Sequence, residues 1–209
     1  MSQDFASAGL TAGQLNAVVD KLGGMEGVNR FLRGELTVSE SAGGWREENG
    51  VIFFSVKSDG TTGPEWIKRL EKKGFHIGSY ARSLLLSPDF KPTSGVTTEL
   101  AVLKGKVFED KDRATGSIRA EADRRKLVKV HAEVACLIRE KFLDEDIEAM
   151  GFWWIVAMHE PIKDSDGVPS LLGADRSDDG CWLSADWVKP GNRWNRDNGF
   201  AFAVSQVSP

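Results

Sequence analysis

The sequence predicts an α+β protein. Helical periodicity dominates the first two thirds of the chain, and short apolar runs separated by Gly and Pro dominate the last third. Helices followed by strands along a chain favour α+β over the alternating pattern of a parallel sheet. We therefore expect an N-terminal helical hairpin, further short helices, and then a mainly antiparallel sheet at the C-terminal end.

The predicted hairpin lies at the start of the chain. Apolar residues recur at helical spacing over residues 11–23, where Thr11 can serve as the N-cap. A Gly-Gly pair at 23–24 interrupts this helix, and the pattern resumes over residues 25–33. Gly34 then ends the second helix, as glycine commonly does just after a helix.

The middle of the chain mixes both kinds of element. Residues 39–50 are rich in Ser and Gly and predict a linker, and residues 51–56 predict a strand. Pro64 stands where the first turn of a helix accepts proline, and that helix ends at Gly74. Ser79 can cap a further short helix.

The second half of the chain contains a long helical segment and most of the predicted strands. Residues 97–107 predict a strand buried on both faces. Residues 114–142 are dominantly helical, with a β-prone break at 127–130. An unbroken apolar run at 152–158 predicts a central strand. Three more strands are predicted at 170–174, 181–185 and 200–204, each bounded by Gly or Pro.

Two domain arrangements fit these elements. The chain forms either one compact α+β unit, or a helical hairpin over residues 1–38 joined through the linker to a larger domain. In the second arrangement the α+β domain covers residues 51–209, and its last strands form a β-meander.

Composition bounds the class and the compartment. Two cysteines, at 136 and 181, are too few for a disulfide framework or a four-ligand zinc site. No long uncharged apolar window and no signal-peptide pattern is present, so we expect a cytoplasmic protein without membrane contact. No phosphate-binding loop or dinucleotide motif is present, so we expect no cofactor and no bound metal.

Charge and tryptophan are distributed unevenly. The formal net charge is −4, but residues 104–141 carry 11 basic and 7 acidic side chains, whereas residues 142–209 carry 5 and 12. The same C-terminal segment holds five of the seven tryptophans. This segregation predicts that the C-terminal end forms an acidic, Trp-rich surface that suits a cationic or sugar-like group.

The leading hypothesis is therefore a non-enzymatic binding or interaction protein, whose partner is a protein or a small polar ligand rather than nucleic acid. The seven candidate ligand-binding residues combine charged side chains near turns with loop aromatics: His159, Glu160, Asp164, Asp166, Arg176, Trp182 and Trp194.

Two alternatives come from other classes. A hydrolase would use His159 as the base, with Glu160 or Asp166 as its partner or as a metal ligand. A small DNA-binding regulator would use residues 11–34, because the hairpin loosely matches a helix-turn-helix with Arg30 and Arg33 on its second helix. No residue is identified as catalytic by a sequence motif.

Residues 164–167, Asp-Ser-Asp-Gly, match the opening of a calcium-binding loop, but no Glu follows at the twelfth position. A tight turn explains this string better than a metal site.

Several strings resemble a group of uncharacterised bacterial proteins, some of them from small or mobile genomes. These are residues 15–24 and 31–35 at the N-terminal end, and residues 161–167, 190–194 and 200–202 at the other end. The resemblance implies a bacterial, cytoplasmic setting, and no activity or catalytic residue is carried over from it.

Overall fold

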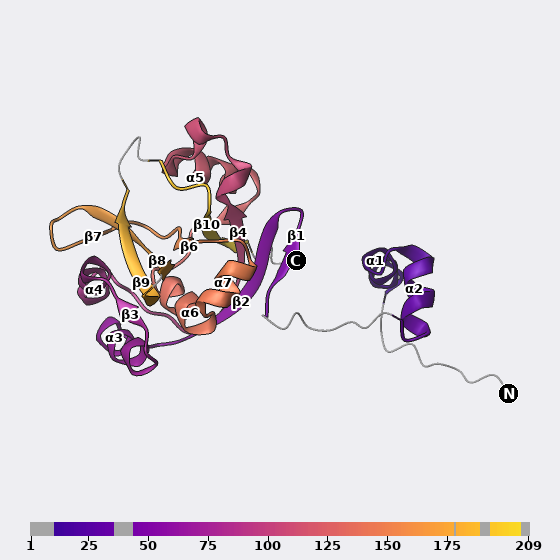
Figure 1. Ribbon diagram of the computed structural model, residues 1–209, viewed down its shortest axis with the longest axis horizontal. Helices are drawn as coiled ribbons and strands as arrows, with labels where there is room; N and C mark the ends of the chain where they lie inside the picture. The colour runs from indigo at the N-terminus through magenta and orange to yellow at the C-terminus, as the bar shows by residue number, and fades with distance from the viewer. Residues whose placement is uncertain (1–10, 36–43, 178, 189–192, 206–209) are drawn as a thin grey trace. The chain divides into compact units, whose positions relative to one another are not determined.

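The chain forms two compact units, residues 1–42 and residues 43–209, in a computed structural model that describes residues 11–35, 44–177, 179–188 and 193–205. The α+β prediction is confirmed, because helices and a mostly antiparallel sheet build the fold (Figure 1). Within the described residues, no helix has the length and the apolar character needed to span a membrane.

The smaller unit contains two helices, α1 (Ala12–Lys21) and α2 (Gly24–Leu32). Thr11 caps α1 as expected. The Thr11 side chain accepts from the Gln14 amide, and the Gln14 side chain accepts from the Thr11 amide at 2.8 Å. Gly23 has a φ of 85°, in the left-handed region that glycine adopts without steric cost, and so turns the chain between the helices.

One sheet organises the larger unit. Its ten described strands are β1 (Arg46–Glu48), β2 (Val51–Asp59), β3 (His76–Ile77), β4 (Ser94–Lys104), β5 (Leu127–Val128), β6 (Trp154–Ala157), β7 (Ile162–Lys163), β8 (Pro169–Ser177), β9 (Gly180–Trp187) and β10 (Asn198–Val204). The main order is β1-β2-β4-β10-β6-β8-β9-β3, with β5 paired to β10 and β7 paired to β8. Only the β10–β6 and β3–β9 pairs are parallel.

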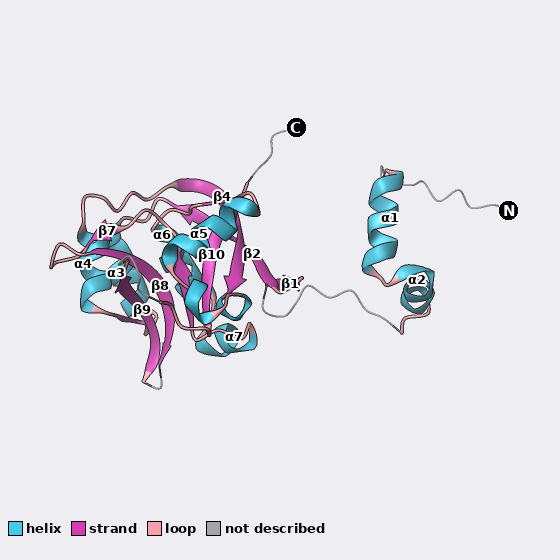
Figure 2. Ribbon diagram, turned by 90° about the horizontal axis from the view of Figure 1, so that it is seen from above, coloured by secondary structure: helices cyan, strands magenta, loops and turns pink. Residues whose placement is uncertain are grey.

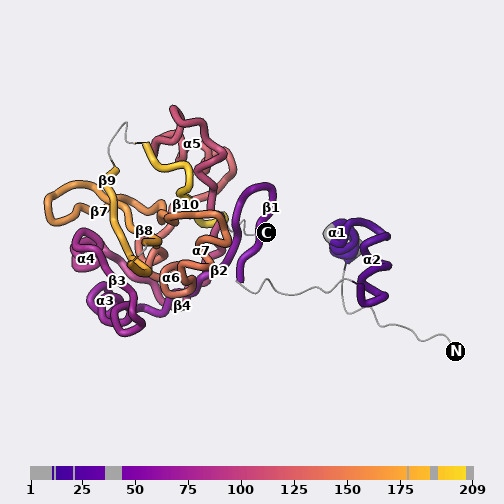
Figure 3. Tube along the Cα trace, viewed as in Figure 1, coloured from indigo at the N-terminus to yellow at the C-terminus, as the bar shows by residue number. Residues whose placement is uncertain are grey.

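The prediction of a C-terminal β-meander is wrong for the last strand, β10. β8 and β9 form an antiparallel hairpin, but β10 then returns to the middle of the sheet, between β4 and β6 (Figure 3). The physical reason lies in its side chains. Phe200 and Phe202 pack on one face and Ala201 and Ala203 on the other, and a strand that is apolar on both faces needs cover from both sides.

Helices cover both faces of this sheet (Figures 1 and 2). α3 (Gly63–Lys72), α4 (Ser79–Leu86), α6 (Glu133–Lys141) and α7 (Asp144–Ala149) pack on one face. α5 (Thr115–Arg124) packs on the other, with the 3₁₀ turns η1 (Gly105–Val107) and η2 (Asp110–Asp112) before it in the chain.

β4 shows how the sequence determines this layering. Leu100 and Val102 enter the core under α6, and Ala101 and Leu103 enter the core under α5, as the prediction of a strand buried on both faces requires. Full burial of a Leu or Val side chain contributes about 1.5–3 kcal/mol. The predicted linker, by contrast, contains β1, whose exposed charged residues carry no strand signal of their own.

A buried guanidinium connects three elements of the larger unit. The Arg139 side chain is fully buried at the end of α6, and its Nη1 donates to Asp144 Oδ1 at 2.8 Å and to the Asp175 carbonyl oxygen at 3.1 Å. Its Nη2 donates to the Phe142 carbonyl oxygen. Arg139 therefore fixes the start of α7 and the C-terminal end of β8 relative to α6.

We predict that Gly173→Ala lowers the free energy of unfolding by about 1–3 kcal/mol, because the new Cβ would overpack the sheet. That atom would lie 2.2 Å from Trp154 Nε1 and 2.6 Å from the Ile155 carbonyl oxygen. Denaturant unfolding measures the change. Gly116→Ala in α5 is the matched control, since its Cβ meets nothing within 4 Å and alanine favours a helix by roughly 0.5 kcal/mol. Equal free energies for the two variants would contradict this packing.

Candidate functional site

His159, just after β6, serves the fold. Its ring is buried, its Nε2 accepts from the Leu172 amide at 2.9 Å, and its Nδ1 lies 2.6 Å from the Glu160 carbonyl oxygen. The tautomer that satisfies both contacts carries its proton on Nδ1. Burial lowers the pKa of His159 to about 4, with a smaller contribution from the nearby Arg119. With both ring nitrogens engaged, the geometry does not support His159 as a base.

Glu160 points the other way, toward solvent, and forms an ion pair with Lys129 that lowers the pKa of its carboxyl. Both line an open groove of about 560 Å³ together with Lys91 and His131. Glu160 is thus a neighbour of His159 in sequence but not a partner of its ring.

The two carboxylates of the 164–167 turn accept hydrogen bonds from different groups. Asp164 is buried, and its Oδ1 accepts from the amides of Asp166 and Val168, each at 2.9 Å. Its Oδ2 accepts from Ser170 Oγ at 3.1 Å. Asp166 accepts from the Tyr80 hydroxyl at 3.0 Å. These contacts account for the turn, and the described residues contain no group of three side chains that would hold a metal ion.

The two predicted loop tryptophans are also engaged. Trp194 is only 4% exposed, and its Nε1 donates to Thr115 Oγ1 at 2.9 Å, which joins the loop to α5. Trp182 stacks on His76 with 4.8 Å between ring centroids, and its Nε1 lies 3.2 Å from Asp179 Oδ1. Trp194 therefore belongs to the core rather than to an exposed platform.

The seven predicted residues consequently do not form one surface. Three of them, His159, Asp164 and Trp194, are buried with their polar groups satisfied. Glu160 lies on the groove that it lines with Lys129, Asp166 lies on a turn held by Tyr80, and Trp182 stacks on His76. Arg176 is the one that lines a pocket with an exposed aromatic ring.

That pocket, the Trp153 pocket, is an open concavity of about 430 Å³. Its lining comes from the end of α7, the residues before β6, β8 and the loop before β10: Glu148, Gly151, Phe152, Trp153, Arg176, Asn195 and Asp197. The pocket therefore draws on four segments that the fold brings together.

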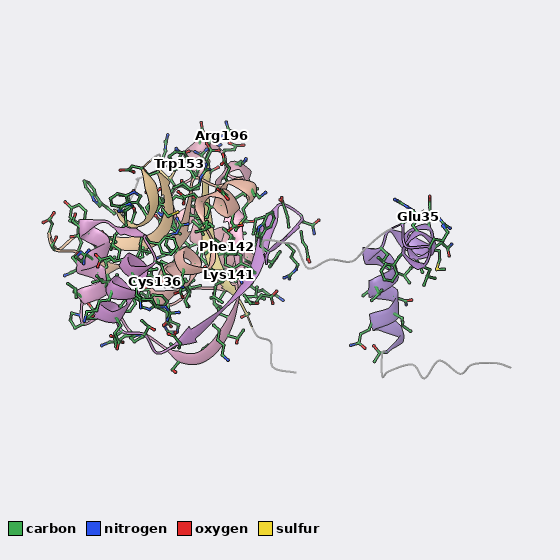
Figure 4. The ribbon with its side chains drawn as sticks, turned by 60° about the horizontal axis from the view of Figure 1, so that its bottom comes forward. Glu35, Cys136, Lys141, Phe142, Trp153 and Arg196 are labelled. Atoms are coloured by element: carbon green, nitrogen blue, oxygen red, sulfur yellow. The ribbon has the colours of Figure 1, made fainter. Side chains whose placement is uncertain are left out.

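Trp153 gives the pocket its aromatic wall. Trp154, the next residue, enters the core under α5, and the alternation of the extended chain sends Trp153 outward, where it is 45% exposed. It lies at the periphery of the unit, in contrast to the buried Cys136 and Phe142 (Figure 4).

Arg176 is held against that ring by three contacts. Its guanidinium carbon lies 5.3 Å from the Trp153 ring centroid, its Nη1 donates to the Phe152 carbonyl oxygen at 3.1 Å, and its Nη2 pairs with Glu148 at 2.9 Å. Its buried Nε has no partner among the residues described. The ring and the guanidinium are therefore fixed relative to each other before any ligand arrives.

The polar side of the pocket comes from a short loop. The Trp153 amide donates to the Asp197 carbonyl oxygen at 2.8 Å, and the Asp197 amide donates to Asn195 Oδ1 at 3.0 Å. The side-chain amide nitrogen of Asn195 and the carboxylate of Asp197 make no hydrogen bond or ion pair within the described part of the chain. These groups can donate to and accept from a ligand.

Sequence reasoning chose Trp194 rather than Trp153 as the exposed ring and missed Glu148, Asn195 and Asp197. A signal for Trp153 was present, because adjacent tryptophans at a strand must face opposite sides. The loop residues carry no such signal, since their position depends on where β10 returns to the sheet.

Comparison with protein-family models, curated proteins and solved structures gives no significant match.

We predict that His159 makes the fold sensitive to mild acid. Because its pKa falls from 6.5 to about 4 on folding, unfolding takes up a proton between these values. Its stabilising contribution is complete above pH 6.5 and is lost as the pH falls toward 4. The free energy of unfolding should drop by about 2 kcal/mol between pH 7 and pH 5.

Denaturant unfolding at the two pH values measures this drop, and His159→Gln should remove most of it while lowering stability at pH 7. An unchanged pH dependence in the variant would show that another group is responsible.

Proposed function

We propose that the larger unit is a non-enzymatic binding module for a small polyhydroxylated ligand such as a saccharide, and that the Trp153 pocket is its site. One observation carries this proposal. An exposed indole and a fixed guanidinium stand beside a side-chain amide and a carboxylate that have no partner among the described residues.

The chemistry of these groups fits a sugar. The apolar C–H face of a pyranose ring packs on an aromatic face, and its hydroxyls both donate and accept hydrogen bonds. Trp153 offers the face, Asp197 accepts from hydroxyls, and the Asn195 amide donates to them. A volume of about 430 Å³ lies in the range of small-molecule sites.

Charge favours a neutral ligand over a cationic one. Glu148 is already paired with Arg176, and the Lys106 ammonium lies 3.7 Å from where a Cβ of Gly151 would stand. The acidic excess of residues 142–209 is thus partly neutralised at this pocket. Asp197 is the carboxylate of its lining that forms no ion pair with any residue that the structure describes. One carboxylate beside nearby cations attracts an ammonium group only weakly, but it accepts a hydrogen bond from a hydroxyl well.

The residues that line the pocket also favour binding over catalysis. The described lining contains no histidine, cysteine, serine or lysine, and of its two carboxylates, Glu148 and Asp197, the first is already paired with Arg176. Arg176 acts as a positioning residue, because its contacts hold the indole and Glu148 in place.

The two alternatives and the bacterial, cytoplasmic setting stay predictions. A hydrolase would need a base other than His159. A DNA-binding hairpin would rely on Arg30 and Arg33, both of which lie near Glu35, at 3.8 Å and 2.7 Å. That pairing reduces the charge available to phosphates, and the absence of a salt-dependent mobility shift with duplex DNA would end this hypothesis.

We predict that Trp153→Ala weakens saccharide binding at least tenfold, because it removes a stacking surface worth about 1 kcal/mol or more in addition to its buried area. Saturation-transfer NMR with galactose, N-acetylglucosamine and maltose at millimolar concentration identifies a binder, and calorimetry then measures its Kd.

Trp187→Ala is the matched control. Trp187 is 42% exposed, close to the value for Trp153, and does not line the pocket. It should leave the Kd within about twofold. Binding that is lost equally in both variants, or no binding of any of the three sugars, would refute the proposal.

A further inference from the structure

The smaller unit exposes most of its apolar side chains. Five large ones on α1 and α2 are between 40% and 74% exposed: Leu15, Val18, Met25, Phe31 and Leu32. Among the residues of this hairpin whose burial the structure describes, only Gly27 is buried. Helices of ten and nine residues are marginal in water without packing against another surface.

The charges on α2 are arranged so that the helix complements itself. Glu26 lies in its first turn, and Arg30 and Arg33 lie in the last turn and at the C-cap. Two copies of α2 that pack antiparallel therefore bring the acidic end of each helix to the basic end of the other. Glu35 neutralises part of the basic end.

The net charge of this surface does not oppose such pairing. Residues 11–35 carry three basic and three acidic side chains, so a second copy is not repelled. A nucleic acid or an anionic membrane would require a basic excess, and a strongly charged protein partner would require the opposite charge in excess.

We propose that the smaller unit is a dimerisation element, in which α2 packs antiparallel against α2 of a second copy about a twofold axis. Met25, Phe31 and Leu32 form the apolar contact, and each Glu26 lies opposite Arg33 of the other copy. Such an isologous contact buries the same patch on both chains and closes the assembly at two copies.

Analytical ultracentrifugation of the full chain tests the proposal. The wild-type protein should sediment as a dimer that dissociates on dilution, and Phe31→Asp should sediment as a monomer. Leu86→Asp is the matched control, since Leu86 is a 57% exposed apolar residue of α4 in the larger unit, and this variant should remain a dimer.

Because Phe31→Asp also removes packing within the hairpin, a charge exchange supplies a test that does not depend on that packing. Glu26→Arg and Arg33→Glu, each alone, place like charges opposite each other and should weaken the dimer roughly tenfold. The double variant restores opposite charges and should return its Kd to within about threefold of wild type.

Three results would overturn the proposal. They are a wild-type monomer at every concentration, a dimer unaffected by Phe31→Asp, and a double variant no tighter than either single one.

Discussion

The buried guanidinium of Arg139 is the contact on which the larger unit most depends. It donates to Asp144 at the start of α7, to the carbonyl oxygen of Asp175 on β8, and to that of Phe142 after α6. Both terminal nitrogens of this guanidinium have partners, whereas its Nε makes no hydrogen bond among the described residues. Removal of one partner from a buried charge costs about 3–5 kcal/mol. The relative placement of these three segments is therefore strongly specified.

The Trp153 pocket inherits its geometry from this contact. α7 begins at Asp144, and its last turn carries Glu148, while Arg176 directly follows Asp175 on β8. The ion pair between Glu148 and Arg176 thus joins two elements that Arg139 has already fixed. The buried ion pair of Arg139 is thus linked, through the short helix α7, to the partly exposed ion pair of Arg176 at the pocket.

The sequence was informative wherever local patterns decide the structure. The cap at Thr11, the alternation along β4 and the break after α5 are all set by near neighbours, and the structure agrees with each. The place of β10 could not be predicted, because its register is set by β4 and β6, which are distant in sequence. The charged strand β1 gave no signal because pairing with β2, rather than its own residues, makes it a strand.

Of the seven site residues predicted from the sequence, Arg176 lines the Trp153 pocket. The Trp-rich C-terminal segment supplies the aromatic wall of that pocket. Trp194 was misplaced because its polar neighbours in sequence indicate exposure, whereas Thr115 and Phe200 enclose it in the fold. Polar neighbours in sequence therefore predict that Trp194 lies in a loop. Whether its ring is buried depends on the elements that this loop packs against.

Nitrogen-15 NMR of the tryptophan indole groups tests the central claim most directly, namely that the Trp153 pocket is the ligand site. The chain has seven tryptophans, and Trp153→Phe assigns the signal of interest. On titration with the sugar that binds, the account predicts a progressive shift of the Trp153 indole signal, with Trp182 and Trp187 unmoved. A saturable shift at Trp182 or Trp187 with Trp153 unmoved would contradict it.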